Sequence, residues 1–179
     1  MAVITSEIDF LNIFLENFLF FAIATSFFLV TGWAWRNTKP YDLPKPLPNW
    51  FRIWFLTMQI GGIILPLVGL VWVIWQGYFS AAIVLISYFF MLGLQILSES
   101  LSLRWFHSFV FVMIPYLYLP YRVWQLYQGL MLLNPVSDLA WIRNLLFIEI
   151  VLWTGNYALD LSQLPRLVRW EVREEIVSR

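Results

Sequence analysis

The chain has 179 residues, of which 61% are hydrophobic, 20% aromatic and only 12% charged. A soluble domain carries about 25% charged residues, so this composition excludes an ordinary water-soluble fold and indicates a multi-pass membrane protein. Eleven basic residues balance eleven acidic ones, which removes the basic surface that nucleic-acid binding requires.

Apolar runs divide the chain into membrane-spanning segments, each long enough for a helix to cross a hydrocarbon core of roughly 30 Å. They are too continuous for the strands of a membrane barrel, so we expect an all-α integral membrane protein with one domain. The N-terminus carries acidic residues and no small-residue cleavage site, unlike a cleavable signal peptide. The five predicted spans cover about 10–35, 54–75, 81–97, 105–133 and 139–159.

The fourth predicted span is unusually long and contains Pro115 and Pro120, which predicts a tilted or kinked helix. Residues 36–53 contain Pro-x-Pro-x-Pro and form a predicted extended loop. Residues 160–179 place apolar residues at helical spacing and form a predicted amphipathic tail at the membrane surface.

Basic residues set the predicted orientation, because cytoplasmic flanks retain Lys and Arg. Nine of the eleven fall in the 36–53 loop, in the connection after the third span or in the tail. The N-terminus and the other two connections have none, so we expect the N-terminus outside and the C-terminus in the cytoplasm.

Charged residues inside the spans are costly unless they are paired or hydrated. At 1.5 Å per residue, Arg122 and Glu149 both lie roughly 15 Å below the outer ends of their spans, which predicts an ion pair. Glu16 and Arg143 lie closer to the outer face and form a second predicted pair. Pairs that fix helix packing and pairs on a proton or ion path both remain possible interpretations.

The segment 115–128 combines tyrosines, glutamines, prolines and an arginine, which cannot all face lipid. It is the best candidate for a ligand pocket or a docking surface. The single histidine, His107, is a candidate axial ligand for a tetrapyrrole in an aromatic setting. The predicted pocket comprises His107, Tyr116, Tyr121, Trp124 and Trp153.

Five helices, eleven tryptophans and a proline-containing first loop on the side of the C-terminus are similar to the tryptophan-rich sensory (TspO/translocator) proteins. Lys39-Pro40 to Trp54 correspond to the first loop of that family, and Asn156-Tyr157 to a motif in its last helix. The resemblance implies a helix-bundle pocket for porphyrins or other hydrophobic ligands.

The sequence has no HExxH, GxSxG, phosphate-binding glycine loop or Cys/His cluster, so we expect neither an enzyme nor a metal site. The aromatic content exceeds what a small bundle can bury, which favours contacts with lipids, with other membrane subunits or with copies of itself. The leading expectation is an accessory or assembly subunit of a membrane complex, and the alternative is a binder of a lipid or tetrapyrrole. The expected location is a bacterial inner membrane or an organelle membrane such as the thylakoid.

Overall fold

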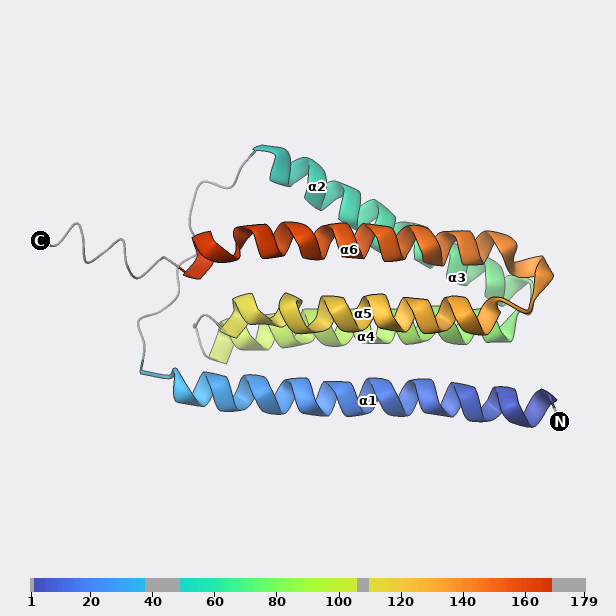
Figure 1. Ribbon diagram of the computed structural model, residues 1–179, viewed down its shortest axis with the longest axis horizontal. Coiled ribbons are helices and arrows are strands. Elements are labelled where there is room, and N and C mark those ends of the chain that lie inside the picture. The colour runs from blue at the N-terminus through green and yellow to red at the C-terminus, as the bar shows by residue number, and fades with distance from the viewer. Residues whose placement is uncertain (1, 38–48, 106–109, 169–179) are drawn as a thin grey trace, which may run out of the picture.

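The computed structural model describes residues 2–37, 49–105 and 110–168, and all regular structure in these ranges is helical. The helices are α1 (Ala2–Ala34), α2 (Asn49–Gln59), a π-helical segment η1 (Ile60–Ile64), α3 (Leu65–Trp75), α4 (Phe79–Trp105), α5 (Val110–Leu133), a 3-10 turn η2 (Ser137–Leu139) and α6 (Ala140–Val168). The N-terminus lies at one end of the bundle together with the α3–α4 and α5–α6 turns (Figure 1). We call this the N-terminal end, and the other the C-terminal end.

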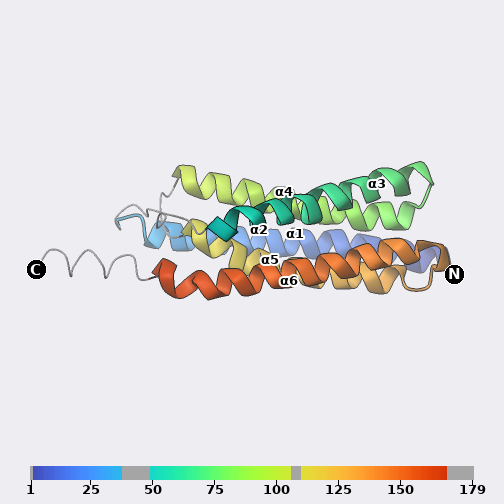
Figure 2. The same ribbon diagram turned by 90° about the horizontal axis from the view of Figure 1, so that it is seen from above.

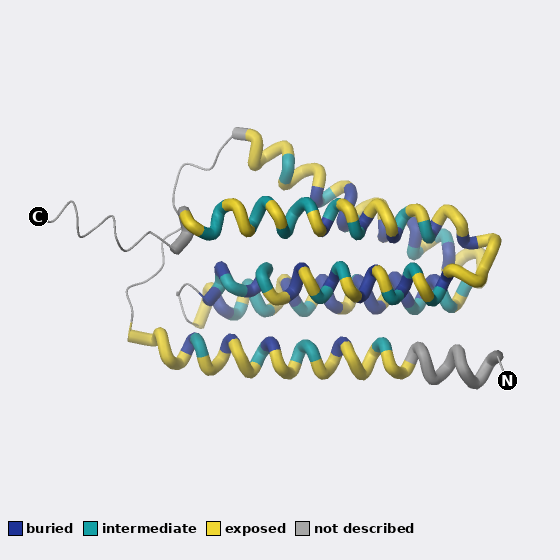
Figure 3. Tube along the Cα trace, viewed as in Figure 1, coloured by how far each residue is buried: buried dark blue, intermediate teal, exposed yellow. Residues whose placement is uncertain are grey.

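Helices α4 and α5 form the centre of the bundle (Figure 1). Helix α1 packs along one side of this pair, and α6 packs against α5 on the other. The continuous rod made of α2, η1 and α3 crosses obliquely, so that η1 contacts α6 and α3 contacts α4 (Figure 2). The outward faces of α1 and α2 are largely exposed, and burial is concentrated on α4 and α5 (Figure 3).

Four stretches of helix are long and apolar enough to cross a membrane: Leu11–Ala34, Trp50–Trp75, Phe79–Trp105 and Ser137–Pro165. This confirms the predicted all-helical bundle with several helices that could span a membrane. Helix α5, the fourth predicted span, is not among these stretches. Its tyrosines, glutamines and arginine make it less apolar than the other long helices. These are the polar residues of the segment 115–128.

Several predicted boundaries are shifted. The third helix extends beyond 97 to Trp105, and the 36–53 loop is shorter than predicted because α2 begins at Asn49. Helix α6 continues to Val168, so the start of the predicted tail belongs to the last long helix. Residues 169–179 and most of the proline-rich loop lie outside the described residues.

A helical irregularity lies in the second span. Helix α5 runs as one element through Pro115 and Pro120, whereas the second span changes to a π-helix over Ile60–Ile64. There the Leu65 N–H donates to the Ile60 carbonyl, five residues back. The π-helix lies directly before Pro66, which has no N–H to donate to the Gly62 carbonyl.

Small residues bring this rod close to α6. A Cβ atom added to Gly61 would lie 2.5 Å from Leu152, and one added to Gly62 would lie 2.8 Å from the ring of Trp153. Gly69 continues the same stripe toward Leu145. Close approach through small residues is a common way for membrane helices to pack, since lipid supplies no hydrophobic drive for association.

We therefore expect Gly62→Ala to lower the free energy of unfolding by about 1–3 kcal/mol, because the added methyl group would displace the Trp153 ring. Gly93→Ala is the matched control, since a Cβ atom added there would have no neighbour within 4 Å and the position is exposed. It should leave stability unchanged or raise it by less than about 1 kcal/mol. Thermal unfolding in detergent followed by circular dichroism measures both. Equal effects of the two substitutions would contradict the packing described here.

Candidate functional site: a buried polar cluster around Arg122

Arg122 lies midway along α5 and is only 1% exposed. Its Nη2 atom donates a hydrogen bond of 2.6 Å to Oε1 of Gln95 on α4. The Gln95 amide in turn donates to Oε1 of Glu99, one turn further along α4, at 2.8 Å. A guanidinium remains charged in proteins, so a full positive charge is held inside the bundle.

Two aromatic faces also contact this cation. The guanidinium carbon lies 4.1 Å from the ring centroid of Trp153 and 5.7 Å from that of Tyr88. The negative face of an aromatic ring attracts a cation, and the attraction is stronger where water is excluded. Trp153 comes from α6 and Tyr88 from α4, so the charge holds three helices together.

Trp153 also connects Arg122 to Glu149. Its indole N–H lies 3.1 Å from Oε2 of Glu149 and 3.0 Å from the hydroxyl oxygen of Tyr88. Glu149 is 1% exposed and lies one helical turn before Trp153 on α6. One tryptophan therefore presents its face to the cation and its N–H to the carboxylate.

The second predicted span joins this cluster through its irregular segment. The Tyr88 hydroxyl donates to the Gly62 carbonyl, which Pro66 leaves without the usual α-helical donor. The tyrosine thereby satisfies a backbone acceptor inside the bundle, where an unpaired carbonyl would be costly. The helical irregularity at η1 is thus part of the site.

A second buried polar cluster, which we call the Asn17 cluster, lies closer to the N-terminal end, where α1, α4 and α5 meet. The Asn17 amide donates to the Ser87 hydroxyl at 2.6 Å. The Gln125 amide lies within 2.9–3.1 Å of three acceptors, the Ser87 hydroxyl, the Ser87 carbonyl and Oδ1 of Asn17. The Tyr121 hydroxyl donates to the same Asn17 oxygen at 2.9 Å. Gln125 is one turn from Arg122 on α5, which brings the two clusters together.

Some polar atoms in these clusters have no hydrogen-bond partner within the described part of the chain. They are the Nε and Nη1 atoms of Arg122, Oε1 of Gln125 and Oε1 of Glu149. All three side chains are at least nine-tenths buried. An unpaired polar atom is costly in a dry interior, so these atoms are where the bundle has unused hydrogen-bonding capacity.

The structure brings Arg122 and Glu149 into one cluster, but the described atoms do not form the predicted direct ion pair. Instead, Trp153 lies between the two charges, and Arg122 interacts with both Glu149 and Glu99 through space. The positions of Arg122 and Glu149 within their spans place the two charges at the same depth in the bundle. They do not reveal which side chain lies between the charges.

The predicted Glu16–Arg143 pair does not form. Glu16 accepts a hydrogen bond from Gln128 at 2.8 Å, because α1 packs against α4 and α5 rather than α6. Arg143 donates to carbonyls of the connection that follows α5, at 2.8 Å to Asn134 and 3.0 Å to Val136. It therefore fixes the α5–α6 turn, a common role for arginine near a helix C-terminus.

The four described residues of the predicted pocket belong to different sites. Tyr116 donates to the Asp160 carbonyl at 2.7 Å, Tyr121 belongs to the Asn17 cluster, and Trp153 to the Arg122 cluster. Trp124 is 52% exposed. His107 lies outside the described residues, and the described residues contain no group of three His, Cys, Asp or Glu side chains that could hold a metal.

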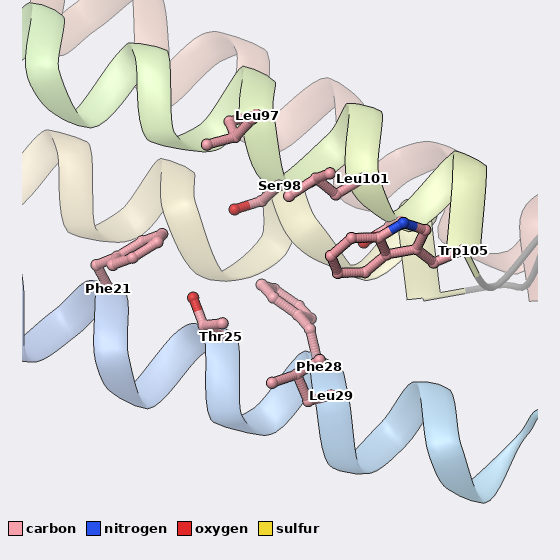
Figure 4. A pocket seen from close by; sticks show the side chains of 9 residues that line it. Phe21, Thr25, Phe28, Leu29, Leu97, Ser98, Leu101 and Trp105 are labelled. Carbon is pink, nitrogen blue, oxygen red and sulfur yellow. The ribbon is translucent and has the colours of Figure 1, made fainter.

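The surface of the bundle has a cleft and a groove in addition to the buried clusters. A cleft of about 70 Å³ lies between α1 and α4, and Figure 4 shows the Thr25 hydroxyl directed from α1 toward it. An open groove of about 580 Å³ lies between α1 and α5 toward the N-terminal end. It is lined by Asn12, Ile13, Glu16, Trp124, Tyr127, Gln128, Met131, Leu132 and Pro135.

The chain was compared with protein-family models, curated proteins and solved structures, and no match was found in any of the three comparisons. The resemblance to the tryptophan-rich sensory proteins therefore rests on sequence features alone. Two of these features meet in the structure, where the Trp54 indole N–H donates to Oδ1 of Asn156 at 2.9 Å.

At a pH high enough to ionise Glu149, Arg122→Met or Glu149→Gln alone should each lower the free energy of unfolding by about 3 kcal/mol, because each leaves a buried charge uncompensated. The double variant should lose clearly less than the sum of the two effects. Thermal unfolding in detergent of the four proteins measures this coupling. The control cycle is Glu16→Gln with Arg143→Met, two residues that share no partner and whose effects should add. Additive effects at Arg122 and Glu149 would mean that Trp153 does not couple them.

Proposed function

We propose that this protein is a non-enzymatic accessory or assembly subunit of a larger membrane complex. The observation that supports this proposal best is the open groove between α1 and α5. It combines an exposed carboxylate with exposed aromatic side chains, at a depth where the surrounding helices are apolar. The lack of catalytic motifs in the sequence supports a role other than catalysis.

The groove is poorly suited to face lipid. Glu16 is exposed and lies five residues inside the apolar stretch Leu11–Ala34, about 8 Å from its end at 1.5 Å per residue. Its hydrogen bond to Gln128 satisfies only part of a carboxylate's capacity to accept. The exposed rings of Trp124 and Tyr127 flank it. This chemistry suits a partner helix that presents a basic or hydroxyl side chain to Glu16 and apolar residues to the rings.

The alternative function is binding of a hydrophobic small molecule, and the cleft between α1 and α4 favours it. Phe21, Phe28 and Trp105 contribute to its lining, and the buried Thr25 hydroxyl has no described partner. Pockets for drug-sized ligands measure roughly 300–1,000 Å³, so a cleft of about 70 Å³ suits one branch of a lipid chain better than a tetrapyrrole.

Site-specific photo-crosslinking in native membranes tests the leading proposal. A photoreactive side chain at Tyr127, in the groove, should yield a crosslink to one membrane protein, and Glu16→Gln should weaken that crosslink. The same probe at Val71, an exposed position on α3, is the matched control and should yield none. Products with lipid only, or the same protein product from both positions, would contradict the proposal. A product of twice the chain's mass would identify the partner as a second copy.

The proposed topology has five passes, with α5 crossing between α4 and α6 and the C-terminal end of the bundle in the cytoplasm. The distribution of basic residues supports this orientation. Tryptophans at both ends of the helices support the number of passes, since these side chains prefer the membrane interface. Trp33, Trp35, Trp50, Trp54 and Trp105 lie toward the C-terminal end, and Trp72, Trp75 and Trp141 toward the N-terminal end. A bacterial inner membrane or a thylakoid-type membrane is the proposed location.

Single cysteines test this topology, since the chain has none of its own. Asn37→Cys, Gln76→Cys and Ser137→Cys change exposed residues in three connections. Asn37→Cys should react with a membrane-impermeant thiol reagent only from the cytoplasmic side, and the other two only from the opposite side. Reaction of Gln76→Cys and Ser137→Cys from different sides would show that α4 and α5 do not both cross.

A further inference from the structure

The Arg122 cluster contains one cation and two carboxylates. Glu149 interacts with the guanidinium from α6, and Glu99 interacts with it from α4 through Gln95. Gln95 accepts from Arg122 and donates to Glu99, so its orientation is fixed by both neighbours. The arrangement places a permanent positive charge between two groups that can each bind a proton.

Charge balance determines how many protons this cluster holds. A buried charge is tolerated only when a nearby opposite charge and hydrogen bonds compensate it. The single guanidinium compensates one carboxylate, so one proton on the other makes the cluster neutral. Groups facing Glu149 are Tyr88 from α4, Arg122 from α5 and Trp153 from α6, which include no second cation.

The surroundings favour Glu149 as the carboxylate that binds the proton. Glu149 is 1% exposed, whereas Glu99 is partly exposed and lies six residues from the end of α4. Repulsion from neighbouring Asp160 disfavours charge on Glu99, but the Gln95 amide bound at Oε1 and the charge of Arg122 oppose this effect. By contrast, Oε1 of Glu149 has no described partner and is free to carry the proton.

A route for proton exchange lies along α5. The partnerless Oε1 of Gln125 and the partnerless Nε and Nη1 of Arg122 come from neighbouring turns of α5. Water at these atoms would satisfy all of them and would connect Glu149 to the Asn17 cluster. Gln128, one turn beyond Gln125 on α5, donates to Glu16 in the wall of the open groove, so the groove begins about one turn beyond this cluster.

From these contacts we infer that Glu149 and Arg122 form a proton-exchange site in the middle of the bundle, connected by water to the α1–α5 groove. Uptake forms an O–H bond at Oε1 of Glu149, and the proton comes from a water molecule. The positive charge of Arg122 then compensates the negative charge of Glu99. Release returns the proton to water and leaves both carboxylates sharing the guanidinium. No electrons are transferred, and the site binds only protons and water.

Infrared spectroscopy of the full chain in lipid vesicles at neutral pH tests this inference directly. The wild type should show one carbonyl band of a protonated carboxyl group, which shifts to lower frequency in D₂O. Glu149→Gln should remove the band, whereas Asp138→Asn, a change in an exposed turn residue, should leave it intact. Gln125→Leu should keep the band but slow its shift in D₂O, because it interrupts the route.

Several results would overturn the inference. They are the absence of the band in the wild type, its persistence in Glu149→Gln, its loss in Glu99→Gln alone, and a band that does not shift in D₂O. Far-ultraviolet circular dichroism of each variant shows whether it is folded. If Glu149→Gln unfolds, the Gln125→Leu exchange rate decides the question, and an unchanged rate overturns the proposed route. The presence of the band and its assignment to Glu149 do not depend on whether the protein has a partner in its groove, and the exchange rate is measured on the chain alone in vesicles.

Discussion

The buried guanidinium of Arg122 is the constraint on which the arrangement of this bundle depends. A charge in an apolar environment must be compensated within a few ångströms, and no single helix can surround it. Helix α4 supplies Gln95 and the ring of Tyr88, and α6 supplies Trp153 and, behind it, Glu149. Hydrophobic burial alone would allow these helices to slide or rotate, but the cation permits only one relative position.

The second span shows how this constraint reaches backbone structure. Pro66 leaves the Gly62 carbonyl without its helical donor, and the helix adopts π geometry over the preceding turn. The released acceptor binds Tyr88, whose ring faces Arg122, while the missing side chain of Gly62 makes room for Trp153. The proline, the glycine and the tyrosine therefore act together at one contact, although they lie on two different helices.

Sequence periodicity and length predicted the helices well, because long apolar runs have few alternatives in a membrane. Residue depth also predicted that Arg122 and Glu149 lie in one layer. Which helices touch could not be derived, and the Glu16–Arg143 pair was wrong for that reason: α1 lies against α5, not α6. Tyr88, Gln95 and Glu99 were overlooked, although their spacing places them on one face of α4. The predicted pocket combined residues of α5 that lie on different faces of this helix and therefore contact different neighbours.

The groove links the two proposals made for this protein. Gln125, one turn from Arg122 on α5, donates through its side-chain amide to Asn17, and Glu16, the neighbour of Asn17 in the chain, lines the groove. A partner helix seated there would exclude water from the N-terminal end of this route and would place its own polar side chain near Glu16. Because exchange at Glu149 requires a water connection, occupancy of the groove would control how fast the buried proton equilibrates. Assembly would then alter a buried site on a helix that does not line the groove, without any change in the fold.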